Sequence, residues 1–524
     1  MDNLIKVNTK IEKEKTVFFS NRKLAIFIFL LAFCVRLAFL LFFTEIDKPS
    51  IGDVWHHWQI AYLSKTIGFK QEFLRLWDFK GMEYYWGLLH PLVLIAGFVI
   101  SGSLSIVVPR IVSVLFGSGV AALVFLIVAR HYGRNTALAS SLFVIFLPTA
   151  IFHDSLGLQE PLGLFFLLLG VFLYPSRSFV AGFSWMLSGM ARAEYWIFGA
   201  ALLLVVVVRE KNLDRRVTAL IGYVIPCLFY MKYLLDKTGN AIYPVYWNYL
   251  VIGAGEWSAK TIELTGKYSL VETVSQVLAI LFFILTLVVF LKKGRSYLFL
   301  LVGLFNLIFV FVVLGFGSYI AGFERVPSEP GIIDKIWIGK MFAFPWVFLG
   351  VVFCVLLFFH LPRKLGKPGN VLGLSFFLIL IMSVQLVWPS IAHFYLKVPG
   401  DYEYNKKSAE LLAQNYSGRG KIILPNQSEF ITYFLVYEHG IGGEKLIASF
   451  YSPFYYYEGD DPFSEWDTFR DEIKGWLERE NAELFMASKN QKEHARMFEL
   501  EEGSLFEYIG EIRAYSFYKV YPER

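Results

Sequence analysis

Long apolar runs alternate with short basic clusters over most of this chain. The first run, residues 24–43, begins after Arg22 and Lys23 and ends at Glu45 and Asp47. About 20 apolar residues are needed for a helix to cross a bilayer, so this run predicts a transmembrane helix. It is longer than the core of a cleavable signal peptide, and no small-residue cleavage site follows it. We therefore expect it to remain as a membrane anchor.

The other apolar runs extend this pattern to eleven predicted membrane spans. In order, they are residues 24–43, 110–129, 136–152, 161–174, 179–190, 195–208, 217–235, 271–291, 297–320, 341–359 and 372–391. With this count, every basic cluster between spans falls on one side, which the positive-inside rule makes cytoplasmic. The four spans from 136 to 208 are short, which implies tilt or local thinning of the bilayer. The apolar piece 88–100 is expected to lie in the outer interface.

The parity of the spans sets the sidedness of the chain. The N-terminus is predicted in the cytoplasm, and the segment after residue 391 on the outer face of the plasma membrane. We therefore divide the chain into a cytoplasmic segment 1–23, a transmembrane domain 24–396 with an outer loop 44–109, and an extracytoplasmic domain 397–524.

The last part of the chain differs in character from the rest. Strand-like segments occur at 421–424, 445–450, 482–486 and 514–521, and a helix is predicted at 463–478. Strands that alternate with helices are typical of an α/β domain with a mostly parallel sheet. The predicted fold class is thus a polytopic α-helical membrane protein with a C-terminal exoplasmic α/β domain.

The composition agrees with a membrane protein and excludes other classes. Hydrophobic residues make up 56% of the chain and charged residues 18%, whereas soluble domains carry about 25% charged residues. The net charge is +5, and the basic residues are dispersed as topology signals, which argues against a nucleic-acid-binding surface. Cys34, Cys227 and Cys354 all fall in apolar runs, so they form neither a disulfide framework nor a zinc motif.

Asp53 is the first residue of the outer face that points to chemistry. It follows Gly52 after the first span and precedes an amphipathic aromatic stretch, residues 54–66. A carboxylate at the edge of the hydrocarbon would have reduced hydration and a raised proton affinity, which suits a general base for a hydroxyl nucleophile. The alternative is that Asp53 caps the following interfacial helix.

His56 and His57 lie on the same stretch as Asp53 and are candidates for binding substrate. Asp53 and His57 could together ligate a divalent metal ion. Adjacent histidines rarely point to one centre within a helix, however, so no cofactor is assigned and a divalent metal ion at Asp53 and His57 stays an open alternative.

Two further acids, Asp154 and Glu160, lie at the predicted outer turn between the third and fourth spans. Carboxylates beside a membrane core are costly and often functional. Glu160 also precedes Pro161, which suits the first turn of a helix, so Glu160 could instead simply be the N-cap acid of that helix.

Arg192 lies on the outer face between the fifth and sixth spans, against the positive-inside trend. Its planar guanidinium would suit the phosphate of a lipid-linked substrate. The alternative is an ion pair with Glu194 or with Asp154. A later outer loop carries Arg325 and Lys340, which could hold an anionic leaving group or snorkel as membrane anchors.

The order and sidedness of these motifs resemble the GT-C integral-membrane glycosyltransferases, in particular the protein O-mannosyltransferase and lipid A aminoarabinose transferase branch. The likeness covers roughly residues 20–400, and its motifs are short. Besides Asp53 after the first span, it is carried by Pro109-Arg110-Ile111-Val112-Ser113, Leu158-Gln159-Glu160-Pro161-Leu162, Ser188-Gly189-Met190-Ala191-Arg192-Ala193-Glu194 and Lys340-Met341-Phe342-Ala343-Phe344-Pro345. No Trp-Trp-Asp-Tyr-Gly run occurs, so the oligosaccharyltransferase branch fits less well.

In such enzymes the sugar arrives on a polyprenyl phosphate or pyrophosphate and is transferred, with inversion, to an acceptor hydroxyl of a protein, lipid or glycan. The resemblance implies that Asp53 is the base and that Glu160 orients the acceptor or the sugar. Cationic side chains would stabilise charge on the leaving phosphate. The donor-phosphate contacts would be Arg192, Arg325 and Lys340, the last standing where arginine is common. The substrate site would further include Asp154, Glu194, His56 and His57.

Two other functions remain open at this level. A lipid or sugar transporter or flippase should show an inverted repeat and charges at the midplane, and the sequence shows neither. The chain could also be a non-catalytic scaffold for its C-terminal domain, because the sequence alone does not bring Asp53 and Glu160 together. The crowding of polar residues at one interface favours the transferase.

Overall fold

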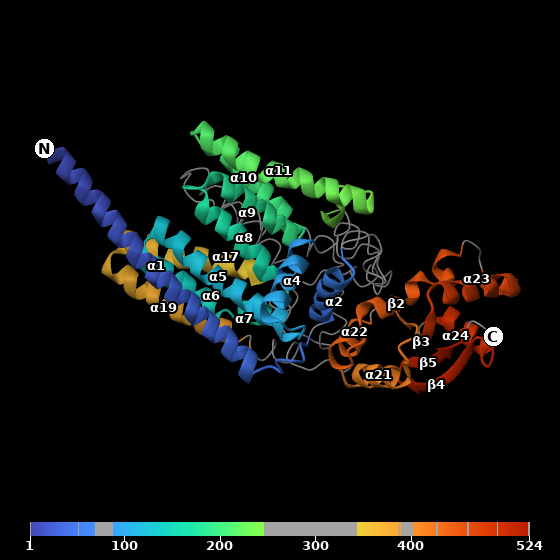
Figure 1. The fold of residues 1–524 in the computed structure, drawn as a ribbon. Helices are drawn as coiled ribbons and strands as arrows, with labels where there is room; N and C mark the ends of the chain where they lie inside the picture. Colours follow the sequence, from blue (N-terminus) through green and yellow to red (C-terminus); the bar gives the residue numbers. More distant parts are fainter. Residues whose placement is uncertain are drawn as a thin grey trace, which may run out of the picture. The chain divides into compact units, whose positions relative to one another are not determined.

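The structure, a computed structural model, describes residues 2–50, 52–68, 87–245, 343–386, 388, 402–425, 428–457, 461–489 and 491–521. The chain divides into two compact units, each made of several segments (Figure 1). Unit 1 comprises Met1–Ile46, Tyr84–His90 and Pro109–Lys397, and unit 2 comprises Asp47–Glu83, Pro91–Val108 and Val398–Arg524. Unit 2 therefore combines most of the outer loop with the C-terminal segment.

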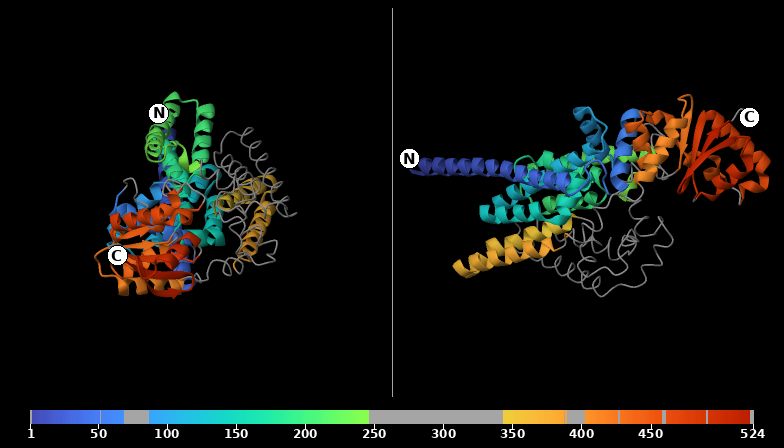
Figure 2. Two further views of the ribbon diagram at one scale, coloured as in Figure 1. Left: turned by 90° about the vertical axis from the view of Figure 1, so that its right-hand side faces the viewer. Right: turned by 90° about the horizontal axis from the view of Figure 1, so that it is seen from below.

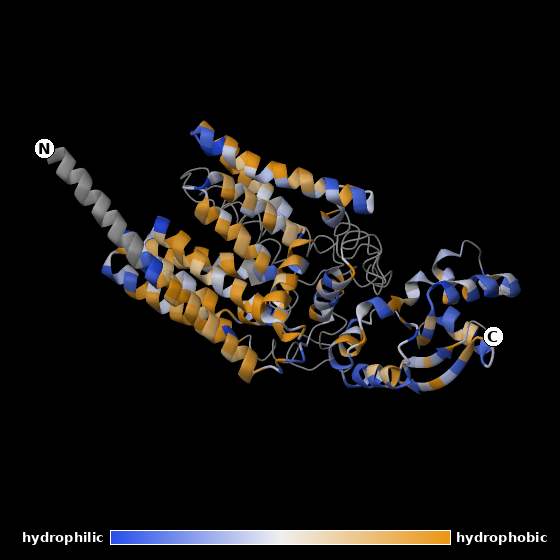
Figure 3. Cartoon of the chain, viewed as in Figure 1, coloured by the Kyte–Doolittle hydropathy of each residue, from blue (hydrophilic) through white to orange (hydrophobic). Residues whose placement is uncertain are grey.

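Unit 1 is built from helices, and most of those coloured in Figure 3 are largely apolar, including α1 from Asn21 to Phe42. They are α1 (Asp2–Phe42), α5 (Val107–Tyr132), α6 (Arg134–Phe146), α7 (Pro148–Leu156), α8 (Glu160–Leu173), α9 (Ser178–Ala191), α10 (Glu194–Arg209), α11 (Leu213–Thr238), α17 (Ala343–Val355), the π-helix η4 (Leu356–His360), α18 (Leu361–Leu365) and α19 (Lys367–Gln385). Large apolar side chains such as Phe42 and Phe229 are exposed, as expected for surfaces that face lipid tails.

Five helical stretches in the described part of the chain are long and apolar enough to cross a membrane, and six if the bent pair α6–α7 counts as one span. These stretches are Asn21–Phe42, Val107–Tyr132, Leu213–Thr238, Trp346–Leu365 and Lys367–Gln385, and each overlaps a predicted span. The predicted spans 271–291 and 297–320 lie outside the described residues. The protein is therefore a multi-pass membrane protein, and the count of eleven spans stays a prediction.

One predicted span is broken. The sequence indicates a continuous helix over residues 136–152, but α6 ends at Phe146 and α7 begins at Pro148, with a bend of 59° between them. Proline lacks the backbone N–H that would continue the helix and pushes the preceding residue out of helical geometry. Leu147 is accordingly extended, with φ −72° and ψ 114°. The break gives α7 its own direction.

Helices α8, α9 and α11 pack closely. A Cβ added at Gly182 of α9 would overlap the carbonyl of Ala219, and one at Gly222 of α11 would overlap the carbonyl of Phe179. Small residues that let backbones approach are the usual device for packing helices in lipid. Ser188 Oγ of α9 also donates to the carbonyl of Gly163 of α8 at 2.7 Å. The bond between Ser188 and Gly163 lies near the ends of α8 and α9 that carry Glu160 and Arg192.

Unit 2 contains the helices α2 (Gly52–Thr66), α21 (Tyr402–Asn415), α22 (Glu429–Tyr433), α23 (Trp466–Arg479) and α24 (Lys492–Glu501), the π-helix η5 (Phe434–Glu438) and a sheet. Short 3₁₀ turns occupy Gly443–Lys445, Ser449–Tyr451, Pro453–Tyr456 and Pro462–Glu465. Helix α4 (Leu89–Ser101) corresponds to the short apolar piece seen in the sequence.

The sheet of unit 2 is drawn in orange and red in Figure 2. Its five strands have the order β2-β1-β3-β5-β4. Its strands are β1 (Lys421–Leu424), β2 (Leu446–Ala448), β3 (Ala482–Ser488), β4 (Phe506–Ile512) and β5 (Tyr515–Val520). Strand β1 pairs in parallel with β2 and with β3, but β5 pairs antiparallel with β3 and with β4. The prediction of a mostly parallel sheet is therefore wrong, because β4 and β5 form a hairpin that turns at Arg513, where φ is +51°.

The core of unit 2 lies between the sheet and the helices α23 and α24. Ile423, Phe485 and Phe506 from the strands pack with Leu477 of α23 and Phe498 of α24.

Candidate functional site

Glu160 and Arg192 meet at one end of the α8–α9 hairpin of unit 1. Glu160 is the first residue of α8, and Arg192 directly follows the last residue of α9. Arg192 Nη1 donates to Glu160 Oε1 in an ion pair, and the two side chains are 12% and 13% exposed. Each charge suits its position, since helix N-termini favour anions and C-termini favour cations. The N-cap position of α8 is Gln159, so Glu160 is not its capping residue.

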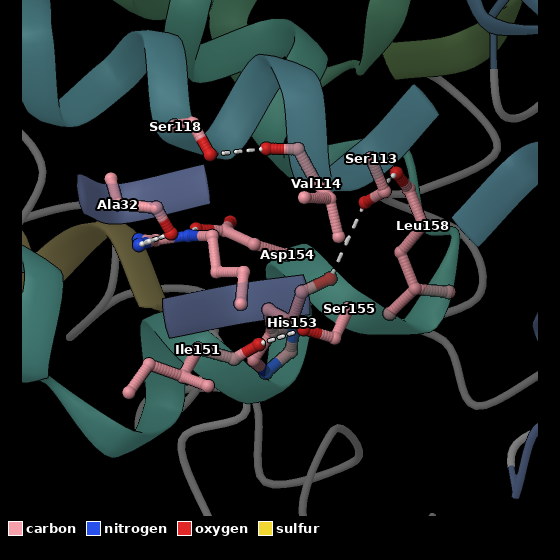
Figure 4. A network of polar contacts seen from close by, with 10 residues as sticks. Ala32, Ser113, Val114, Ser118, Ile151, His153, Asp154, Ser155 and Leu158 are labelled. Atoms are coloured by element: carbon pink, nitrogen blue, oxygen red, sulfur yellow. Dashed lines mark hydrogen bonds and ion pairs between the residues drawn. The ribbon is translucent and has the colours of Figure 1, made fainter. Parts of the chain in front are cut away.

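A second ion pair lies in the same unit. Arg36 Nε of α1 donates to Asp154 Oδ2 of α7 at 2.6 Å, and Arg36 Nη1 donates to the carbonyl of Ala32 at 3.3 Å (Figure 4). The side chain of Arg36 is fully buried and that of Asp154 is 9% exposed. Among the described residues, Arg36 Nη2 has no hydrogen-bond partner. The sequence analysis did not single out Arg36, although an arginine inside an apolar run is itself a signal of function or pairing.

The two ion pairs interact electrostatically. Asp154 interacts with both Arg36 and Glu160, and the neighbouring His153 interacts with Arg192. The structure thus brings together Asp154, Glu160 and Arg192, which the sequence analysis selected from separate turns. The partner of Arg192 in these ion pairs is Glu160, and the partner of Asp154 is Arg36.

Helix α7 is held in place by α5. A Cβ added at Gly117 of α5 would overlap the carboxyl group of Asp154. Ser113 Oγ donates to the carbonyl of Leu158 at 3.2 Å (Figure 4). Arg110 Nε donates to the carbonyl of Ser155 at 3.0 Å. These bonds fix the turn between α7 and α8, which ends at Glu160.

Arg110 also ties this turn to the end of the first helix. Its Nη1 donates to the carbonyls of Glu45 and Ile46 at 2.6 and 2.9 Å, and its Nη2 donates to Thr44 Oγ1 at 3.0 Å. One buried guanidinium therefore donates to three backbone carbonyls, those of Glu45, Ile46 and Ser155.

Asp53 belongs to unit 2 and lies in the first turn of α2. It is exposed, so the reduced hydration expected from the sequence is not present in this structure. The following stretch is also not the amphipathic interfacial helix that was predicted. Its residues from Val54 to Ser64 are buried except His56, because segments of unit 2 surround the helix.

His56 and His57 differ in their surroundings. His56 Nε2 lies 3.3 Å from Glu429 Oε1, the first residue of α22, and burial lowers the pKa of His56 to about 3. His57 is 3% exposed. The sequence analysis missed Glu429, since it is separated from His56 by most of the chain.

The donor set does not fit a metal centre around Asp53 and His57. The part of the chain that the structure describes holds no group of three or more His, Cys, Asp or Glu side chains arranged for a metal ion.

Three predicted site residues are not placed. Lys340 and Arg325 lie outside the described residues, and so does the side chain of Glu194, whose backbone begins α10. Their roles stay predictions.

Known structures share this fold. ArnT from Cupriavidus metallidurans, solved bound to undecaprenyl phosphate, aligns with a TM-score of 0.52 at 11% identity, covering 96% of this chain and 98% of ArnT. The oligosaccharyltransferase of Archaeoglobus fulgidus, in a complex with Zn and sulfate, aligns with a TM-score of 0.51 at 12% identity, covering 94% of this chain and 72% of that protein. Its apo form gives a TM-score of 0.50 at 10% identity and covers 92% and 72% of the two chains.

No protein-family model matches the sequence, and no curated protein matches it. The similarity therefore concerns the fold. This chain shares the fold of ArnT and of the archaeal oligosaccharyltransferase, in keeping with its apolar helices and its C-terminal sheet.

Proposed function

We propose that this protein is a glycosyltransferase that moves a sugar from a polyprenyl phosphate or pyrophosphate to an acceptor hydroxyl on the outer face of the plasma membrane. The observation that carries the proposal is the pair Glu160–Arg192 beside Asp154–Arg36, embedded among apolar helices of a GT-C fold. Charged groups at such a position are costly and usually mark a site for a polar substrate. The undecaprenyl phosphate bound to the similar ArnT structure supports this donor class.

Arg192 is the proposed contact to the donor phosphate. A guanidinium has five N–H donors in a planar fork whose geometry matches a phosphate. The carboxylate of Glu160 does not use all five donors, so Arg192 can contact a phosphate at the same time. Glu160 is the first residue of α8 and pairs with Arg192, so the N-terminus of α8 lies beside Arg192. Helix N-termini favour anions. Lys340 and Arg325 are proposed as further cationic contacts.

The reaction we propose is a displacement at the anomeric carbon. Asp53 takes the proton of the acceptor hydroxyl while the acceptor oxygen forms the new bond to the anomeric carbon. The bond from that carbon to the phosphate oxygen breaks, and its electron pair leaves on the phosphate, where Arg192 stabilises the charge. Attack opposite the leaving group inverts the anomeric centre.

The other acids hold the reactants in place. Glu160 orients the acceptor or the sugar and fixes Arg192 through their ion pair, while Asp154, Glu194, His56 and His57 complete the substrate site. The acceptor is a protein, lipid or glycan. In this arrangement the N-terminus is cytoplasmic and unit 2 is extracytoplasmic.

The experiment that tests the proposal compares wild type with Asp53→Asn. The purified protein is supplied with undecaprenyl- or dolichyl-phosphate carrying radiolabelled hexose or pentose, and with a membrane extract as the source of acceptor. Loss of transfer by about 100-fold or more in the variant is expected if Asp53 is the base, since general-base catalysis contributes on the order of 100- to 10,000-fold.

Asp47→Asn is the matched control, because Asp47 is an exposed acid of the same loop. Full transfer by Asp53→Asn would remove Asp53 from the base role. If wild-type protein moves the intact lipid-linked sugar between the leaflets of a vesicle without cleaving it, the chain is a flippase instead. If it does neither, the scaffold alternative stands.

A further inference from the structure

Helix α2, which carries Asp53, is enclosed on nearly all sides. Trp55 and Trp58 are 0% exposed, and Gln59, Ile60 and Ala61 are at most 1% exposed. A helix lying on a membrane surface would leave one polar face in water. The consecutive burial along α2 instead requires protein on opposite faces of the helix.

Four aromatic side chains of the C-terminal segment, residues 398–524, pack around Trp55 and form what we call the Trp55 socket. The centroid of the Trp55 ring lies 4.8 Å from that of Phe430, 4.9 Å from that of Tyr433 and 6.1 Å from those of Phe434 and Tyr402. Such aromatic pairs stabilise the packing beyond the effect of the area they bury. All four partners belong to α21, α22 or η5, which follow the last predicted span.

Polar bonds fix the direction of α2 within this socket. Gln59 Nε2 donates to Thr432 Oγ1 at 3.4 Å, and the backbone N–H of Gly443 donates to the hydroxyl of Tyr62 at 3.0 Å. A Cβ added at Gly443 would also press on the ring of Tyr62. Hydrophobic contact alone would allow the helix to slide or rotate, whereas these bonds specify one register.

Glu429 brings a carboxylate to the base of the same helix. Its Oε1 lies 3.3 Å from His56 Nε2, and a Cβ added at Gly52 would lie 3.8 Å from the same oxygen. The side chain of Glu429 is 8% exposed, and a buried carboxylate is tolerated only when polar groups compensate it. The residue directly before Asp53 thus packs against an acid from the C-terminal segment.

We propose that the C-terminal segment is an integral part of the active site, in which Glu429 and the Trp55 socket act as positioning elements that hold Asp53 at the start of α2. The inference rests on the proposed role of Asp53 as the base. Glu429 acts through His56 and the backbone of α2, and it does not itself exchange protons with the acceptor. The segment after the last span is thereby required for the transfer step.

The kinetic test uses full-length Glu429→Gln, with Glu438→Gln as the matched control. Glu438 is the last residue of η5 and pairs with Lys406 at 2.9 Å. We expect Glu429→Gln to lower kcat by about 10- to 100-fold while the donor KM changes little, because misplacing a catalytic group by about 1 Å can cost 100-fold. The control should retain its kcat. His56→Gln should lower kcat similarly, and the double variant should be no worse than either single one.

A second measurement does not depend on activity. Hydrogen–deuterium exchange of residues 52–66 is compared in full-length wild type, Trp55→Ala, Glu429→Gln and Glu438→Gln. We expect faster exchange of residues 52–66 in Trp55→Ala and in Glu429→Gln, but not in Glu438→Gln. The exchange of the unit 1 helices should stay unchanged in all three variants. Unchanged exchange of residues 52–66 in both Trp55→Ala and Glu429→Gln would overturn the anchoring of α2.

The two measurements separate the hypotheses. If wild type transfers no sugar but the exchange result is as expected, the proposed function fails and the anchoring stands. If wild type is active and Glu429→Gln keeps its full kcat, the positioning role of Glu429 fails and the proposed function stands.

Discussion

Arg36 Nε and Asp154 Oδ2 are 2.6 Å apart, although the two residues are separated by 118 positions in the sequence. This pair joins the first membrane helix to the short helix α7, and α7 leads into the turn that ends at Glu160. The pair therefore connects the stability of the helical unit to the geometry of the candidate site.

Arg36→Met should be strongly destabilising. It leaves the carboxylate of Asp154 buried without its partner, and breaking a buried ion pair by removing one member costs about 3–5 kcal/mol. Thermal unfolding in detergent measures the effect. The double variant Arg36→Met/Asp154→Leu should recover much of the loss, since apolar replacement of both members is often neutral or stabilising.

The exposed pair Lys232–Asp236 of α11 is the control for that experiment, with side chains 69% and 52% exposed. Lys232→Ala should change the unfolding free energy by at most about 1 kcal/mol. Equal destabilisation by Lys232→Ala and Arg36→Met would show that burial of the pair is not what matters.

Arg192→Gln should weaken binding of undecaprenyl phosphate by about 10-fold or more, because hydrogen bonds to charged groups contribute about 1.5–3 kcal/mol. Native mass spectrometry of the detergent-solubilised protein measures the affinity. Arg177 is a suitable control, since it is exposed and lies at the other end of α9. A similar loss in Arg177→Gln would point to general lipid binding.

Gly117→Ala should destabilise unit 1 by about 1–3 kcal/mol, the usual range for overpacking. The added methyl group would overlap the carboxyl group of Asp154, so either α5 or α7 must shift. Gly475→Ala in α23 is the comparison, because its Cβ would only touch the end of the Arg479 side chain at 3.4 Å. That variant should be slightly stabilising, by about 0.5–1 kcal/mol. Higher stability of Gly117→Ala than of wild type would contradict the contact.

Unit 2 should lose stability on mild acidification through His494. Burial lowers the pKa of this imidazole from its ordinary 6.5 to about 4. The unfolded chain therefore takes up the proton at a higher pH than the folded chain. The stability is complete above pH 6.5 and declines from pH 6.5 to 4, by about 3 kcal/mol in all.

Unfolding of the full chain between pH 7.5 and 4.5, followed by hydrogen exchange of the β3 strand, measures this dependence. His494→Phe should flatten the profile, whereas His439→Gln, which changes an exposed histidine of the same unit, should leave it unchanged. An identical slope in wild type and His494→Phe would assign the pH dependence to another group.

The local pattern of the sequence predicted the helices of unit 1 and most strands of unit 2. Hydrophobic periodicity and the basic clusters between apolar runs are local signals. Strand β4 was missed because Gly510 interrupts its alternation, at the place where its register with β5 shifts. The break at Pro148 was missed because the apolar run continues through it.

The candidate site was predictable only in part. Glu160 and Arg192 stand at helix ends, where a charge in an apolar sequence attracts notice. Arg36 lies within the first apolar run, so a signal existed, but no local pattern identifies Asp154 as its partner. The burial of α2 depends on residues 402–443. The periodicity of apolar residues within a helix does not show which distant segment of the chain covers it.

The contact between Gln59 and Thr432 spans 373 positions of the chain, and this has a consequence for biogenesis. At about 5–20 residues per second, ribosomes need roughly 20–75 seconds to synthesise the intervening segment. Through that interval the nascent helix α2 lacks the residues that will enclose it. A chain whose synthesis stops before Glu429 would carry every predicted span and the proposed base, yet on our proposal it would be inactive. Quality control could therefore detect an incomplete product by the aromatic side chains of Trp55 and Trp58 that stay uncovered.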